Sequence, residues 1–147
     1  MSAERTAGSK WGAERSGVYL APADTSAIRA AAARGSLAWT ELDSAAARSK
    51  DQFLAACARD LGFPDWFGGN WDALADCLQD LSWQPASGLV VLWHGARRFA
   101  EAAPDEFATA LEIFRDATIY WKEHGCLFIV LLDGQPRDTV LPPFTVP

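Results

Sequence analysis

Two kinds of hydrophobic pattern alternate along the chain, one typical of buried strands and one typical of helices. GLVVLWHG (88–95) and CLFIVLLDG (126–134) are continuous apolar runs bounded by glycine, which is typical of strands that a parallel sheet buries on both faces. GVYLAP (17–22) and LAWTELD (37–43) are shorter and predict two further strands. We therefore expect a small parallel sheet of three to four strands.

Segments with helical periodicity lie between these strands. They predict helices over about 24–34, 45–61, 71–81 and 105–124. The fourth helix is the longest, and the apolar stripe along it consists of Phe107, Leu111, Phe114, Thr118 and Trp121. Because strands alternate with helices, the sequence predicts an α/β fold in which helices pack on the faces of the sheet.

The chain has 147 residues, which is the size of one domain. Residues 1–16 are rich in Gly, Ser, Ala and charge, so we expect disorder there. Residues 17–134 would form the domain, and 135–147 a proline-rich, extended tail. No apolar run reaches the roughly 18 residues of a membrane-spanning helix, and the N-terminal segment lacks the apolar stretch of a secretory signal. We therefore expect a cytoplasmic protein.

Charge, cysteine content and the absence of known motifs limit the partners and cofactors that the sequence allows. The net charge of -6 argues against a nucleic-acid partner, because affinity for phosphates comes from Lys and Arg. It suits a basic protein partner, although mild acidity also serves solubility. Cys57, Cys77 and Cys126 are widely spaced and match no metal-binding pattern, so we expect thiols in the core and no metal. No glycine-rich phosphate-binding motif occurs, so we expect no nucleotide cofactor.

The stretch FPDWFGGNWDALADCLQDLSW (63–83) has the most unusual composition. Asn70 is a good N-cap for the helix over 71–81. Trp71, Leu74, Ala75, Leu78 and Leu81 then share an inward stripe, and the opposite side carries Asp72, Asp76, Gln79 and Asp80. Like charges four residues apart cost a few tenths of a kcal/mol, so the sequence tolerates a local penalty.

The sequence on both sides of this helix leaves its negative charges without nearby cations. No Lys or Arg occurs between Arg59 and Arg97, so the carboxylates have no cation in their own segment. Trp66 and Phe67 precede a pair of glycines, and large aromatics beside flexible backbone are typical of interface anchors. Trp83 falls on the same side if the helix continues. Each residue alone fits a solvated helix, but the combination indicates a binding surface.

The run P-x-aromatic-aromatic-G-x-N-x-D-A-L-x-D-C-L resembles the signature of the barstar family, bacterial inhibitors of secreted guanyl-specific ribonucleases. Eleven of its fifteen positions carry the match: Pro64, Trp66, Phe67, Gly68, Asn70, Asp72, Ala73, Leu74, Asp76, Cys77 and Leu78. More weakly, LVVLW, LEIFRDA and GCLFIVLL resemble the family's middle strand, last helix and last strand. The likeness covers residues 37–133 and implies a barstar-like fold, to which 17–36 add a strand and a helix.

The resemblance implies that the helix and the loop before it enter the active site of a basic, extracellular-type ribonuclease or nuclease toxin. The helix carboxylates would take the place of RNA phosphates. Asp76 corresponds to the family's central carboxylate and Asp72 to the one a turn earlier. Trp66 corresponds to an aromatic that packs on the nuclease's catalytic histidine, and Asn70 to a polar contact at the helix start. Asp116 takes the place of a second acidic contact, where the family often has Glu.

This sequence also departs from the family pattern. Ala75 stands where one member has Trp, Gln79 replaces a small hydroxyl residue, and Trp83 is displaced by two positions. These changes leave the helix carboxylates Asp72 and Asp76 in place and alter the residues around them, so the sequence does not identify the nuclease. The expected binding residues are Trp66, Phe67, Gly68, Asn70, Asp72, Asp76, Gln79, Trp83 and Asp116. The resemblance implies neither a cofactor nor catalysis.

Two other interpretations stay open. Paired carboxylates near tryptophans also occur in glycoside hydrolases. Against an enzyme, Asp72 and Asp76 are neighbours on one exposed turn, and nothing in the sequence buries one of them as a general acid. His94 and His124 have no evident Ser or Cys partner, which favours a structural role for both.

The other interpretation is a binding module that keeps the fold but has a different partner: another toxin, a second copy of the chain or a regulatory protein. Dependence on Asp76 and on salt would indicate a ribonuclease. Dependence on Trp66, Phe67 and Trp83, with tolerance to salt, would indicate an apolar partner.

Overall fold

The computed structural model describes residues 11–64, 68–80 and 87–146. Within these residues, helices and strands alternate along the chain much as the hydrophobic pattern predicts. The elements are η2 (Ala13–Arg15), β1 (Gly17–Leu20), α2 (Ser26–Arg34), β2 (Ala38–Asp43), α3 (Lys50–Leu61), α4 (Trp71–Leu78), β3 (Leu89–His94), α5 (Ala96–Ala102), α6 (Pro104–Glu123) and β4 (Phe128–Leu132). No helix among them is both long enough and apolar enough to cross a membrane.

The strands form one four-stranded sheet in the order β1-β4-β3-β2, and every neighbouring pair is parallel. The α/β class with a small parallel sheet is therefore confirmed. All five residues of β4 and the first five of β3 are buried, as the two apolar runs predict. The edge strand β2 has only one buried residue, Leu42, which agrees with its more polar sequence.

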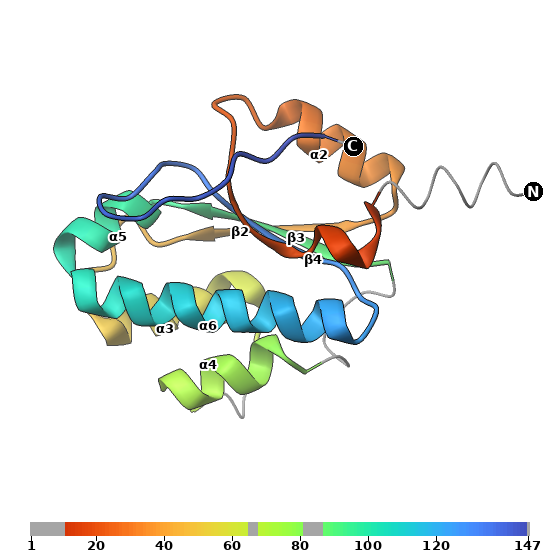
Figure 1. Ribbon diagram of the computed structural model, residues 1–147. Coiled ribbons are helices and arrows are strands. Elements are labelled where there is room, and N and C mark those ends of the chain that lie inside the picture. The colour runs from red at the N-terminus through yellow and green to blue at the C-terminus, as the bar shows by residue number, and fades with distance from the viewer. Residues whose placement is uncertain (1–10, 65–67, 81–86, 147) are drawn as a thin grey trace, which may run out of the picture.

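Helices cover both faces of the sheet, and the direction of each crossover decides which face they take. From β1 the chain crosses to β2 at the far edge, whereas from β2 it returns through β3 to β4. Right-handed crossovers that run in opposite directions place their helices on opposite faces. Accordingly, α2 lies on one face and α3, α5 and α6 on the other, with α4 on the outer side of that helical layer (Figure 1).

Each face of the sheet has its own apolar core. The larger core packs Trp93 of β3 against Phe53 of α3 and Phe114 of α6, with ring centroids 5.4 and 5.1 Å apart. The smaller core joins Ile28 of α2 to Ile129 of β4 and to Phe144 near the C-terminus. Two cores explain why the central strands are apolar on both sides, since neither face meets solvent.

The helices differ from the prediction in three places. The helix expected over 71–81 ends earlier, at Leu78, with Gln79 as its C-cap. The helix expected over 45–61 begins at Lys50, because Ser49 is its N-cap and accepts a hydrogen bond from the backbone of Gln52. The short helix α5 is not evident from the pattern, since its seven residues are too few to show a clear apolar stripe. Its start is set instead by Gly95, whose φ of 75° suits glycine, and where an added Cβ would collide with the backbone of Ala45.

The two ends of the described chain pack together on the α2 side of the sheet. Phe144 is buried between Trp11 and Tyr19, with ring centroids 5.9 and 5.1 Å away, and the Arg15 guanidinium lies 4.7 Å above its ring. The backbone of Leu20 also exchanges hydrogen bonds with the tail, donating to Pro142 and accepting from Phe144. Residues 11–16, placed by the sequence in the disordered segment, therefore make defined contacts, and 1–10 lie outside the described residues.

Candidate protein-binding site

The helix α4 begins where the sequence predicts, at a backbone turn built from glycine and asparagine. Gly69 has a φ of 68°, which favours glycine, and a side chain there would meet open space. Asn70 is extended, and its Oδ1 accepts a hydrogen bond of 2.7 Å from the backbone N–H of Ala73. This bond satisfies one of the otherwise unpaired N–H groups at the helix start.

Apolar packing and a hydrogen bond hold α4 to the rest of the described domain. The ring of Trp71 lies 6.1 Å from that of Phe53 on α3, and the side chains of Leu74 and Leu78 are fully buried. At the other end, the indole Nε1 of Trp121 on α6 donates a 2.7 Å hydrogen bond to the backbone carbonyl of Leu78. The helix is therefore fixed at both ends, and its outer face is presented on a rigid support.

Asp72 and Asp76 lie on that outer face, one turn apart, and both are exposed. Among the described residues neither carboxylate forms an ion pair, and the last turn of α4 contains no basic residue. Beneath them, burial together with Asp80 and Asp76 raises the pKa of the Cys77 thiol, so this thiol stays neutral. The surface can therefore present two unneutralised negative charges at a fixed spacing to cationic groups of a partner.

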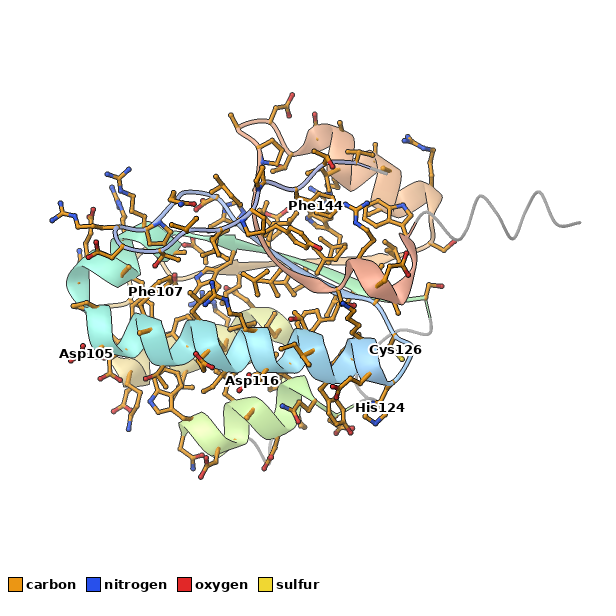
Figure 2. All side chains as sticks on the ribbon, viewed as in Figure 1. Asp105, Phe107, Asp116, His124, Cys126 and Phe144 are labelled. Carbon is orange, nitrogen blue, oxygen red and sulfur yellow. The ribbon has the colours of Figure 1, made fainter. Side chains whose placement is uncertain are left out.

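The structure describes six of the nine residues that the sequence predicts for binding. Gly68 and Asn70 are exposed at the start of α4, and Gln79 is half-buried where the helix ends. Asp116 is exposed on α6, the helix that packs against α4, and Figure 2 shows it midway along that helix. The three aromatic residues, Trp66, Phe67 and Trp83, lie outside the described residues.

A comparison with protein families assigns most of the chain to one family. The family model described as Barstar (barnase inhibitor) matches residues 37–133, which is more than half of the chain. The chain belongs to the barstar family. A search among curated proteins finds no match to it. The part that matches the family contains α4 and the two helices that hold it, whereas β1, α2 and the C-terminal tail lie outside it.

Two polar features of the structure were not predicted from the sequence. The hydrogen bond between Trp121 and Leu78 joins residues 43 positions apart, and no local sequence pattern predicts it. The second feature is His94, whose ring nitrogens lie 2.7 Å from Glu41 and 3.3 Å from Asp133. Its polar partners agree with the structural role expected for this histidine. A signal existed, since His94 and Asp133 each stand at the carboxyl end of a buried apolar run, where parallel strands bring side chains together.

Proposed function

We propose that this protein inhibits a basic, barnase-type microbial ribonuclease by occluding the nuclease active site with α4 and the loop before it. The observation that carries the proposal is the pair Asp72 and Asp76, exposed and unneutralised on a helix held at both ends. Cationic groups that bind RNA phosphates are the natural complement of two such carboxylates. Membership of the barstar family supports this partner class.

The remaining predicted residues have supporting roles in this proposal. Asn70 holds the helix start and offers its amide to the partner, while Asp116 and Gln79 contribute polar contacts at the rim. Gly68 lets the backbone approach closely, and Trp66, Phe67 and Trp83 supply apolar anchors. In this proposal the protein acts in the cytoplasm of the producing cell, needs no cofactor and catalyses no reaction.

The test is a titration of ribonuclease activity with the purified protein, using basic guanyl-specific microbial ribonucleases at low and high salt. We expect stoichiometric inhibition of at least one nuclease, weakened by salt because the opposed charges are screened. Asp76→Asn should bind at least about 30-fold more weakly, because truncating one partner of a buried charge pair costs about 2 kcal/mol or more.

The matched control is Asp24→Asn, which removes the same charge beside α2, on the opposite face of the sheet from α4. The Oδ1 of Asp24 accepts bonds from Ser26, and an asparagine keeps this acceptor. Equal inhibition by wild type and Asp76→Asn would contradict the role of α4. Equal loss in both variants would indicate a general charge effect.

A second candidate is a binding or immunity protein for a different toxin or regulatory partner. The same two carboxylates favour it, because they select for a cationic surface and not for ribonuclease chemistry in particular. Inhibition of no ribonuclease in the panel would contradict the first proposal. Capture of another basic protein by wild type but not by Asp76→Asn would then support the second.

A further inference from the structure

A cluster of three ionisable side chains joins the carboxyl ends of three strands, away from α4. Glu41 belongs to β2, His94 is the last residue of β3, and Asp133 directly follows β4. The His94 Nε2 lies 2.7 Å from Glu41 Oε1, and its Nδ1 lies 3.3 Å from Asp133 Oδ2. Asp133 also accepts a bond from the backbone N–H of Gly95, at 3.2 Å.

The hydrogen-bond roles in this cluster determine the protonation of the ring. An ionised carboxylate only accepts hydrogen bonds, and a neutral imidazole has one donor nitrogen and one acceptor nitrogen. Both contacts can be hydrogen bonds at once only if both nitrogens of His94 carry a proton. We propose that His94 acts as a proton-dependent clamp, which ties the edge strand β2 and the end of β4 to β3 when its imidazole is charged.

The charged neighbours of the clamp lie around an open depression of about 700 Å³. Besides the clamp residues, its lining includes Asp43 from β2, Asp60 from α3, and Arg97 and Arg98 from α5. Arg29 of α2 lies 3.5 Å from Glu41, and Arg59 of α3 is paired with Asp60. No group of His, Cys, Asp and Glu side chains in the described residues is arranged to hold a metal ion. The three clamp residues already satisfy one another, which favours a structural clamp over a ligand site.

The pKa of His94 reflects two opposing effects. Partial burial lowers the pKa, but the hydrogen bond that the ring donates to Glu41 and the charges of Asp133 and Glu41 raise it by more, so it lies above its ordinary value. The pKa of Glu41 is lowered, first by the hydrogen bond from Trp39 and then by the one from His94. The exposed fractions of the three clamp side chains are 37–40%, so the cluster can exchange protons with solvent.

These directions define the pH window in which the clamp is complete. Since folding raises the pKa of His94, its contribution is present in full below the unfolded value, about 6.5, and is lost as pH rises through the folded value. Since folding lowers the pKa of Glu41, its contribution is lost as pH falls through that folded value. The clamp is therefore strongest in mildly acidic solution, between these two pKa values.

Nuclear magnetic resonance of the imidazole nitrogens tests the charge state, because the chain contains only two histidines, His94 and His124. We expect the His94 signals to titrate above the midpoint of a histidine in an unstructured peptide. Glu41→Gln and Asp133→Asn should each lower that midpoint, because each removes one of the two carboxylates. A midpoint at or below the peptide value in wild type would overturn the proposal, whatever the variants do.

Unfolding in urea between pH 5 and pH 8.5 tests whether the clamp stabilises the fold. The free energy of unfolding of wild type minus that of His94→Gln should fall as pH rises, because only wild type loses a charged clamp. Replacing the other histidine, as His124→Gln, is the control, since its Nδ1 meets a backbone carbonyl of its own helix, that of Tyr120. If the difference in unfolding free energy between wild type and His94→Gln does not change with pH, the proposal is overturned.

Discussion

The indole of Trp121 donates a 2.7 Å hydrogen bond from Nε1 to the backbone carbonyl of Leu78, which joins α6 to the last turn of α4. The last carbonyls of a helix have no partner within the helix. Both side chains are fully buried, so the indole supplies a hydrogen bond that water would supply at an exposed helix end. This contact fixes the end of the helix that carries Asp72 and Asp76.

Trp121→Phe should therefore destabilise the fold by about 1–3 kcal/mol, because it leaves a buried carbonyl without a donor. Unfolding in urea measures the loss. Trp39→Phe is the matched control, since its Nε1 donates to the exposed carboxylate of Glu41 at 2.8 Å, and water can replace that bond. If the two variants lose the same stability, the Leu78 carbonyl does not depend on the indole.

Removing the N-cap of α4 separates helix stability from binding. Asn70→Ala should lose about 1 kcal/mol of unfolding free energy, as should Ser49→Ala at the start of α3, because each removes the acceptor for a backbone N–H. Only Asn70→Ala should also weaken binding to the nuclease, since Asn70 belongs to the proposed interface. Unfolding in urea and inhibition titrations on both variants check this, and equal binding losses would assign the effect to stability alone.

Much of the fold follows from local sequence pattern. Continuous apolar runs predicted β3 and β4, and both are buried strands at the centre of a parallel sheet. The stripe from Phe107 to Trp121 predicted the buried side of α6, because a 3.6-residue period leaves little choice of face. Asn70 was recognised as an N-cap for a similar reason, since its side chain accepts a hydrogen bond from a backbone N–H only three residues away.

The remainder depends on contacts between distant segments, which local pattern does not encode. Glu41, His94 and Asp133 meet only because the strand order brings three carboxyl ends together. Ser44 is buried for the same kind of reason, since it accepts a 2.9 Å bond from the distant Trp93 indole. The start of α3 is different, because its N-cap Ser49 is a local signal that was not recognised. The candidate site was found from the family pattern more than from composition.

The three cysteines should differ in reactivity. No disulfide joins them, Cys57 and Cys77 are buried, and Cys126 is half-buried. Burial raises the pKa of both buried thiols, and thiolate is the reactive form. An aromatic disulfide reagent at pH 8 should therefore modify Cys126 first in the native protein, and the fast phase should vanish in Cys126→Ser. A fast phase of unchanged size in that variant would contradict the assignment, and denaturant should expose the other two thiols in every case.

Phe144 provides the last prediction, because it is the residue through which both ends of the described chain meet. It is 4% exposed, packs against Trp11 and Tyr19, and lies beneath the Arg15 guanidinium. Phe144→Ala should cost about 3–5 kcal/mol of unfolding free energy, the usual range for removing a buried phenylalanine. The neighbouring Val140 is 85% exposed, so Val140→Ala should change stability by no more than about 0.5 kcal/mol.

The same variant also separates the two faces of the molecule. Phe144 lies on the α2 side of the sheet, whereas α4 lies on the other side, beyond α6 (Figures 1 and 2). At a temperature where Phe144→Ala remains folded, inhibition of the nuclease should therefore match wild type, although the variant unfolds at lower urea concentration. If Phe144→Ala were as stable as wild type, the tail would not stabilise the smaller core. A specific loss of inhibition with the fold intact would instead place the tail in contact with the partner.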